Sequence, residues 1–141
     1  MNFKEIEFTT QNGIAIIKFN RSEVMNCIGP NTHRELISAW QEFKTNDALK
    51  VAIITGAGER AFCSGADLKS AITGGLVPFS EADKQLHREG KVDGIIGPSR
   101  WTDIYKPIIA AINGVAYAGG LEWACFADMR IVEEQIGRAH V

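Results

Sequence analysis

Apolar and polar residues alternate over residues 3–8, and a second run, apolar and β-branched, covers residues 14–19. Alternation with a period of two is typical of a strand that buries one face. The intervening Gln11-Asn12-Gly13 offers the residue types that close tight hairpin turns. The pattern therefore predicts a β-hairpin near the start of the chain.

A helical period appears over residues 32–44, where one face collects the apolar side chains of Leu36, Ile37, Trp40 and Phe43. Thr32 and Glu35 have the spacing of a capping box, in which two side chains bond the free N–H groups at a helix start. We therefore expect one amphipathic helix that begins near Thr32 and ends near Lys44.

Three further apolar runs predict strands. The runs at residues 51–55 and 107–112 are short, as expected of strands that are buried on both faces. The first is followed by Gly and the second by Asn-Gly. Residues 129–132 form the next candidate strand. Between the last two runs, a glycine pair opens a predicted helix over residues 121–127.

The remaining segments are less regular. Residues 72–99 are mostly polar and contain glycine and proline, so we expect a loop with one surface helix there. Residues 101–105 are a candidate short helix. No internal repeat or linker divides the chain, which predicts one α/β domain: a strand, strand, helix, strand unit followed by strand-then-helix turns.

Composition and charge exclude several classes of protein. The chain has 15 Lys+Arg against 17 Asp+Glu and no long run of like charges, which argues against nucleic acid or a membrane surface as a partner. Its three cysteines share no CxxC spacing, so neither a disulfide framework nor a zinc site is indicated. With no apolar leader or membrane-length apolar run, we expect a soluble, cytoplasmic protein.

Two segments, residues 62–68 and 113–122, place backbone amides beside small side chains, where a ligand can approach closely. In one interpretation, the N–H groups of Ala66 and Gly119 converge on a carbonyl oxygen and stabilise the negative charge that develops there. Gly119 would lie in the first turn of a helix, where free N–H groups and the helix dipole favour an anion. The alternative is two ordinary strand-to-helix turns, and neither segment alone decides between them.

Glu122 follows the glycine pair in the first helical turn, where the dipole stabilises a carboxylate for structural reasons alone. Its neighbours are apolar: Leu121, Trp123, Ala124, Cys125 and Phe126. Such a setting would desolvate the carboxylate and favour general acid/base use. The sequence leaves both roles open.

Other candidate sites find little support. Residues 56–58 follow a strand but lack the complete phosphate-binding patterns of nucleotide-binding loops. Ser64 lacks the G-x-S-x-G context of a hydrolase nucleophile. His33, His87 and His140 show no paired spacing, so a metal site is not expected.

Three motifs together carry a family resemblance. AFCSGADL (residues 61–68) and KPIIAAINGVAYAGGLEWACFADMRI (residues 106–131) resemble the two signature regions of the enoyl-CoA hydratase/isomerase, or crotonase, superfamily. FNRSEVMN (residues 19–26) resembles its N-terminal strand-end motif. The order and spacing are specific, and they imply an α/β fold in which ββα turns form a ClpP/crotonase-like spiral.

The resemblance also implies an acyl-CoA thioester substrate and hydration of a 2-enoyl-CoA. The N–H groups of Ala66 and Gly119 match the family's two oxyanion donors, and Glu122 matches the first of two catalytic glutamates. The second glutamate would fall at or just past Val141. Because one glutamate and an oxyanion hole also suit an isomerase, a dehydratase or another lyase, those reactions remain alternatives.

Substrate-binding positions of the family match residues in three segments of this chain. These residues are Val24, Ser64, Ala66, Asp67, Leu68, Lys69 and Gly119. The backbone of Ser64, Ala66 and Leu68 would hold the adenine end of coenzyme A. Arg21 or Lys69 could contact its phosphates. For both cations a solvated surface position is the favoured alternative. No separate cofactor is implied, because coenzyme A is part of the substrate, and the full-length protein would be a homotrimer or a dimer of trimers.

The end of the chain departs from the family pattern. Residues 136–141 can be written in codons that match a common sequencing-adapter sequence, so we interpret them as a non-native tail on an incomplete spiral core of residues 1–135. The alternatives are a naturally shortened paralogue and a catalytically inactive fragment. A shortened spiral would expose apolar faces and favour aggregation.

Overall fold

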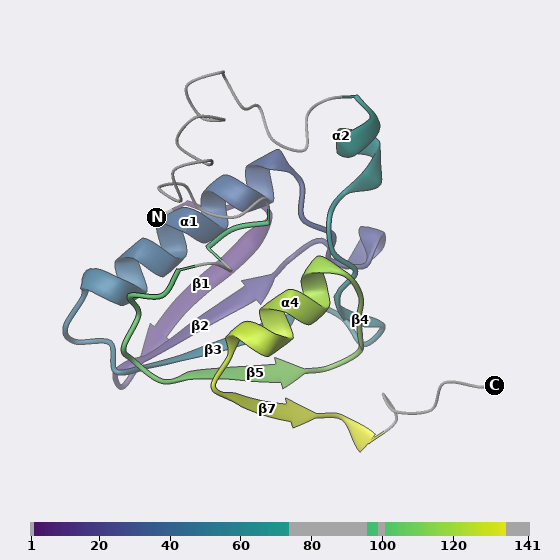
Figure 1. The fold of residues 1–141 in the computed structure, drawn as a ribbon. Helices are drawn as coiled ribbons and strands as arrows, with labels where there is room; N and C mark the ends of the chain where they lie inside the picture. The colour runs from purple at the N-terminus through teal and green to yellow at the C-terminus, as the bar shows by residue number, and fades with distance from the viewer. Residues whose placement is uncertain (1, 74–95, 99–100, 135–141) are drawn as a thin grey trace.

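A computed structural model of the chain describes residues 2–73, 96–98 and 101–134. The main sheet has the strand order β1 (Ile6–Gln11), β2 (Ile14–Phe19), β3 (Val51–Gly56), β5 (Ile108–Ile112) and β7 (Met129–Val132). β1 pairs with β2 in the antiparallel sense, whereas all later neighbours are parallel (Figure 1). The α/β class and the runs predicted as strands are confirmed.

The N-terminal hairpin turns through Asn12 and Gly13, which have φ angles of 52° and 81°. These positive values suit the residue types found there, because Asn and Gly tolerate the left-handed region. β1 begins at Ile6, later than the alternating pattern predicts. The carboxylate of Glu35 accepts the N–H groups of residues 4–6, so a side chain bonds this stretch of backbone.

Helix α1 (Pro30–Thr45) starts earlier than predicted, and the capping-box prediction is wrong. Gly29 precedes the helix and Pro30 occupies its first position, where a missing N–H costs nothing. Thr32 lies one turn inside, and its Oγ1 accepts the Gly29 N–H at 3.2 Å. Glu35 bonds β1 and therefore does not close a capping box.

The core lies between one face of the sheet and two helices, α1 and α4 (Gly119–Phe126) (Figure 1). The indole of Trp40 on α1 stacks on that of Trp123 on α4, with ring centroids 5.5 Å apart. Phe19 of β2 meets Trp123 edge to face at 6.2 Å. All three side chains are fully buried, so this aromatic cluster joins both helices to the sheet.

The opposite face of the sheet is less covered than predicted. Alternate side chains of β3 and β5 are only partly buried, whereas the sequence pattern predicted strands buried on both faces. Ile16, Ile53, Ile109 and Met129 lie side by side across four strands on this second face. The prediction was wrong because α1 and α4 both lie on the other face.

Several short elements were not predicted from the sequence pattern. β4 (Ala61–Cys63) and β6 (Val115–Ala116) form a small parallel sheet, α2 (Leu68–Ile72) follows β4, and a 3-10 turn, η1 (Ser22–Val24), follows β2. The helix predicted at 101–105 is irregular backbone instead. This stretch runs into Lys106-Pro107, and a residue that precedes proline disfavours the helical region of φ and ψ.

Other predictions lie outside the described residues. They include most of the 72–99 loop with its surface helix, and the 136–141 tail that bounds the predicted 1–135 core. Within the described ranges, no helix has the length and apolarity needed to cross a bilayer.

Candidate active site

The two glycine-containing turns meet in space at the ends of β4 and β6. The Gly119 nitrogen lies 2.9 Å from the point that a Cβ on Gly65 would occupy. The Tyr117 N–H donates to the Cys63 carbonyl at 3.1 Å, which ties the two turns together. A Cβ on Gly120 would lie 1.9 Å from the Cys63 oxygen, so only glycine lets α4 start so close to β4.

At this meeting point, the backbone N–H groups of Ala66 and Gly119 find no acceptor in the part of the chain that the structure describes. A parallel bridge pairs Ala66 with Ile28: the Ile28 N–H donates to Gly65 at 2.8 Å, and the Asp67 N–H donates to Ile28 at 2.9 Å. The Ala66 N–H therefore points away from Ile28. Counting only partners within the described ranges, neither Ala66 nor Gly119 donates a backbone hydrogen bond. Among the described residues the predicted pair of donors is thus without acceptors, and the turns that carry it are in contact.

Ala118 sets the direction of the Gly119 N–H. It is the residue that precedes α4, and its backbone angles are φ 45° and ψ −117°, a combination that a residue with a Cβ rarely adopts. Its carbonyl accepts the N–H groups of Leu121 at 2.9 Å and Glu122 at 3.1 Å. The first helical bonds therefore hold Ala118 in this conformation.

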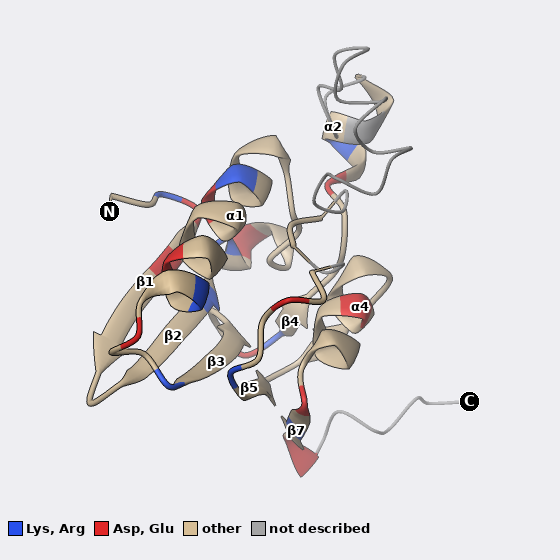
Figure 2. Cartoon of the chain, turned by 60° about the vertical axis from the view of Figure 1, so that its left-hand side comes forward, with Lys and Arg blue, Asp and Glu red and all other residues tan. Residues whose placement is uncertain are grey.

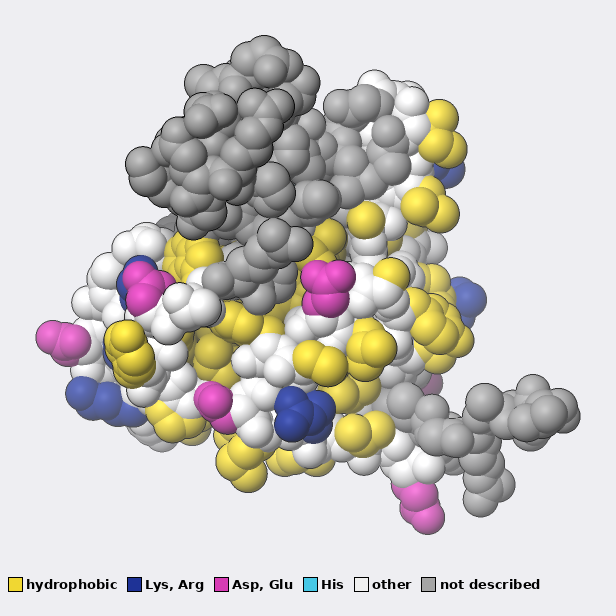
Figure 3. Space-filling view, in the orientation of Figure 1, with side chains coloured by type: hydrophobic (Ala, Val, Ile, Leu, Met, Phe, Trp, Pro, Cys, Tyr) yellow, Lys and Arg dark blue, Asp and Glu magenta, His cyan; other side chains and the backbone are white. Residues whose placement is uncertain are grey.

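Glu122 lies in the first turn of α4 and is the one charged residue of that helix (Figure 2). Its side chain is exposed, contrary to the expectation that apolar neighbours desolvate it. Leu121 and Cys125 are themselves exposed, whereas Trp123 and Ala124 are buried and Phe126 packs against the core. Apolar side chains gather on the surface over α4, as Figure 3 shows.

Asp67 stabilises the turn that carries Ala66. Its Oδ1 accepts the N–H groups of Lys69 at 3.1 Å and Ser70 at 3.4 Å, which caps the start of α2. Its Oδ2 lies 3.2 Å from a guanidinium nitrogen of Arg21. Burial acts to raise the pKa of Asp67, but the hydrogen bond and charge of Arg21, with the two N–H donors, outweigh it and lower the pKa. The predicted contact residue is therefore a structural carboxylate.

Arg21 is engaged within the protein. Besides Asp67, its guanidinium donates to the Cys27 carbonyl at 2.8 Å and lies 3.8 Å from the Glu5 carboxylate. The side chain is four-fifths buried, with a relative exposure of 19%. The guanidinium therefore has protein partners and does not take the solvated surface position that the sequence allowed, and its contact with a phosphate stays a prediction.

The other predicted coenzyme A contacts lie beside this turn. Leu68 and Lys69 begin α2 and are exposed, Leu68 at 73%. Ser64 is half-buried, and its N–H donates to the Met25 carbonyl at 3.0 Å. That bond brings the end of η1, with Val24 exposed at 39%, next to the turn. The predicted residues are thus neighbours, although they come from distant stretches of sequence.

Cys63 supports the turn and lacks the properties of a nucleophile. Burial raises the pKa of its thiol to about 12, so the thiol stays protonated at neutral pH. Its Sγ accepts the Gly65 N–H at 3.4 Å.

Sequence reasoning missed two asparagines that hold the loops around the site. Asn26 is buried, and its Nδ2 donates to the carbonyls of Ala57 and Ala61 at 2.9 and 2.8 Å. Asn113 exchanges hydrogen bonds with the backbone of Gly56 at 2.9 and 3.0 Å. Their places in the motifs, Asn26 just after η1 and Asn113 just after β5, were the available signal, but their partners are distant in sequence.

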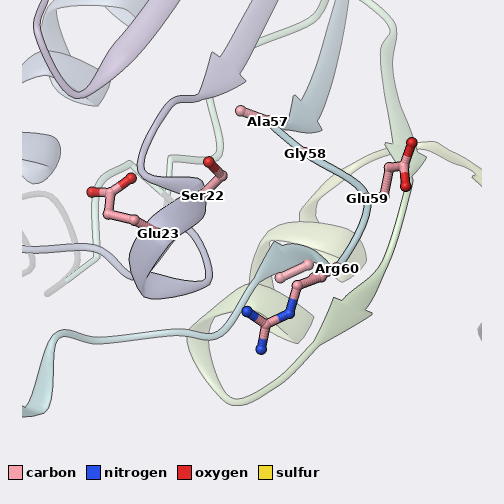
Figure 4. Close-up of a pocket in the computed structure, with 7 residues that line it drawn as sticks. Ser22, Glu23, Ala57, Gly58, Glu59 and Arg60 are labelled. Atoms are coloured by element: carbon pink, nitrogen blue, oxygen red, sulfur yellow. The ribbon is translucent and has the colours of Figure 1, made fainter.

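A separate hollow of about 250 Å³ lies beside η1, away from the Gly65–Gly119 contact. Figure 4 shows the residues that line it, which are Ser22, Glu23, Ala57, Gly58, Glu59, Arg60 and Ala61. It contains none of the predicted site residues. Across the described ranges, no three His, Cys, Asp or Glu side chains gather as metal ligands would.

Comparison with known proteins identifies the family. The family model described as enoyl-CoA hydratase/isomerase matches residues 9–137. The chain is 37% identical over 127 residues to (E)-benzylidenesuccinyl-CoA hydratase of Thauera aromatica, an alignment that covers 89% of this chain and 46% of that protein. It is 39% identical over 131 residues to carnitinyl-CoA dehydratase of Proteus mirabilis, covering 93% of this chain and 46% of the relative.

Solved structures give the same result for the fold. An enoyl-CoA hydratase/isomerase from Mycobacterium paratuberculosis superposes with a TM-score of 0.78 at 29% identity, over 95% of this chain and 50% of that one. The arrangement is thus that of the crotonase-like α/β enzymes. The chain belongs to the enoyl-CoA hydratase/isomerase family, as its three motifs predict, and it spans about half the length of the curated relatives it matches.

Proposed function

We propose that the protein is an acyl-CoA hydratase that adds water to a 2-enoyl-CoA through an enolate held in an oxyanion hole. The observation that supports the proposal is the contact between Gly65 and Gly119, beside which the N–H groups of Ala66 and Gly119 have no acceptor among the described residues. Relatives named as hydratases and dehydratases of acyl-CoA compounds support it.

In the proposed reaction, the thioester carbonyl oxygen accepts hydrogen bonds from Ala66 and Gly119. A water oxygen adds to the β-carbon as the water loses a proton, and the resulting enolate receives a proton at the α-carbon. The two N–H groups stabilise the oxygen on which charge develops, and removal of one such donor typically costs about 3 to 4 kcal/mol of transition-state stabilisation.

Glu122 is the proposed acid/base group of the described residues. It lies one turn after Gly119, so the same helix start supplies both the donor and the carboxylate. The carboxylate takes the proton from water in hydration, and its acid form returns one in the reverse direction. A second glutamate, as the family resemblance implies, would share these steps.

Coenzyme A would lie along the turn from β4 into α2. We assign it Val24, Ser64, Leu68 and Lys69, because these residues are adjacent and all but Ser64 are exposed. Asp67 would contribute through its backbone and its cap on α2, since its carboxylate is bonded to Arg21. Ala66 and Gly119 would contact the acyl end.

Dehydration of a 3-hydroxyacyl-CoA is the same reaction in reverse, and the relative named carnitinyl-CoA dehydratase makes it the second candidate. Isomerisation of an enoyl-CoA needs only one mobile proton and the same oxyanion hole, so it is the third. For the whole protein we also propose a cytoplasmic homotrimer or dimer of trimers; the exposed side chains of Met129, Ile131 and Val132 on β7 suit burial against further protein.

Hydration of crotonyl-CoA tests the proposal, followed as loss of the enoyl-thioester absorbance. The 141-residue chain is assayed beside the protein expressed from the complete gene at its source locus. Turnover by the complete protein supports a hydratase. Acyl-CoA binding without turnover redirects the search to isomerisation, and absence of both contradicts the proposal.

A further inference from the structure

Ile96 covers Gly119 from a stretch of chain that the three motifs do not include. A Cβ on Gly119 would lie 2.5 Å from the Ile96 Cδ1, so the two residues are in direct contact. Ile96 has a relative exposure of only 5%. An apolar side chain therefore lies against the residue whose N–H is the second proposed oxyanion donor.

Two hydrogen bonds from different helices hold the backbone at this point. The Trp123 indole N–H on α4 donates to the Ile96 carbonyl at 2.9 Å, in a buried position. On the other side, the Gly97 N–H donates to Nδ1 of His33 on α1 at 2.8 Å. Ile96 is thus fixed between the two helices.

Gly97 fits this place because it has no side chain. Its φ angle is 98°, and a Cβ there would lie 2.9 Å from the Trp123 ring and 3.2 Å from the Leu36 side chain. Because the space around Gly97 is filled, its backbone can adopt only one arrangement. That arrangement is stable only while the Gly97 N–H has an acceptor.

Resting on the proposed function, we propose that His33 is a positioning residue: through its hydrogen bond to Gly97 it holds Ile96 against Gly119, where Ile96 bounds the space for the acyl group. His33 does not touch the proposed substrate. Its Nδ1 can accept only when that nitrogen carries no proton. Burial, and secondarily the charge of Arg34, lower the pKa of His33, which favours the neutral ring.

Two consequences follow for the bound acyl group. Ile96 keeps water away from one side of the Gly119 N–H, and hydrogen bonds to a developing oxyanion are stronger where water is excluded. It also limits the room beside that N–H. The contact should therefore affect how the acyl part of the ligand binds, while coenzyme A itself lies along a different segment.

The test compares butyryl-CoA with free coenzyme A, which lacks the acyl carbonyl, in titrations of the protein expressed from the complete gene. His33→Leu keeps the volume and removes the acceptor, whereas His33→Asn keeps an acceptor near the position of Nδ1. Gln41→Ala is the matched control, since Gln41 is exposed on the same helix. Ile96→Ala removes the apolar contact and leaves α1 unchanged.

We expect His33→Leu and Ile96→Ala to weaken butyryl-CoA binding by roughly tenfold, the scale of a lost buried contact or an unpaired N–H. Coenzyme A binding should stay unchanged, His33→Asn should recover most of the loss, and Gln41→Ala should match the wild type. Should His33→Leu lose its cooperative melt, Ile96→Ala and His33→Asn still decide the question.

If His33→Leu and Ile96→Ala weaken the binding of both ligands equally, or weaken the binding of neither, the positioning role is overturned. Failure of the wild-type protein to bind butyryl-CoA more tightly than coenzyme A counts against the proposed function itself. The two failures are therefore distinguishable in one set of titrations.

Discussion

The Gly119 nitrogen lies 2.9 Å from the position of an absent Cβ on Gly65, and that absence is what lets the two turns touch. Gly65 also has a φ of 92°, which disfavours any other residue there. The same glycine thus meets a backbone requirement and a packing requirement. Both must hold for the Ala66 and Gly119 N–H groups to share one oxyanion.

Gly65→Ala should damage the site more than an ordinary glycine substitution. The new Cβ meets the Gly119 nitrogen and the Tyr117 carbonyl oxygen at about 3 Å and takes a strained φ, so we expect a loss of about 2 to 4 kcal/mol in the free energy of unfolding. Urea denaturation measures it. Gly58→Ala is the control: its φ is 77°, but its nearest neighbour is the Ser22 side chain. Equal losses in the two variants would contradict the packing argument.

Ala118→Gly should stabilise the fold. Ala118 has a φ of 45° and a ψ of −117°, a conformation that costs a residue with a Cβ about 1 to 3 kcal/mol and costs glycine little. After the greater entropy of glycine in the unfolded chain is subtracted, a net gain of about 1 kcal/mol remains. Thermal melts compare it with Ala48→Gly, an exposed site without positive φ, which should lose stability. A loss at both positions would mean that Ala118 is unstrained.

Glu122→Gln should abolish most turnover and leave binding largely intact. The amide keeps the size of the side chain but cannot take a proton from water, and general acid/base groups typically contribute about 10² to 10⁴ in rate. Crotonyl-CoA turnover and butyryl-CoA titration, both on the protein from the complete gene, separate the two effects. Glu133→Gln, also exposed, is the control. Wild-type turnover in Glu122→Gln would remove this carboxylate from the mechanism.

The Asp67–Arg21 pair should make stability depend on acid pH. Because the pKa of Asp67 is lower in the folded state than its ordinary value of 3.8, its contribution is complete above that value and is lost as pH falls through the folded-state pKa. Asp67→Asn should therefore lower the melting temperature at neutral pH and flatten the decline below pH 3.8. The matched variant Asp47→Asn alters an exposed carboxylate and should keep the wild-type acid profile.

Much of the fold was predictable because apolar runs and turn residues are local signals. The hairpin, β3 and β5 follow from their apolar runs and from Gly or Asn-Gly at their ends, and β7 follows from its apolar run alone. β4 and β6 are too short to show a period, and the helix predicted at 101–105 lacks a counterpart in the described backbone. The role of Glu35 was misassigned because its partners, the N–H groups of residues 4–6, are distant in sequence.

The site was predictable only in part for the same reason. Ala66, Gly119 and Glu122 are visible in the motifs, but the contact between Gly65 and Gly119 is tertiary. His33 gave no signal, because a lone histidine without a paired partner predicts nothing, and its bond to Gly97 crosses the fold. The exposure of Glu122 also depends on how α4 is turned, which its apolar neighbours do not determine.

The proposed oxyanion hole of Ala66 and Gly119 is tested most directly by the infrared carbonyl stretch of bound butyryl-CoA. The ligand is labelled with carbon-13 at the thioester carbon and bound to the protein from the complete gene. Two N–H donors on the carbonyl oxygen weaken the C=O bond, so we predict a band shifted to lower frequency than that of the free ligand, and a smaller shift in Gly65→Ala. A bound ligand whose carbonyl band stays at the free frequency would contradict the assignment of Ala66 and Gly119 as an oxyanion hole.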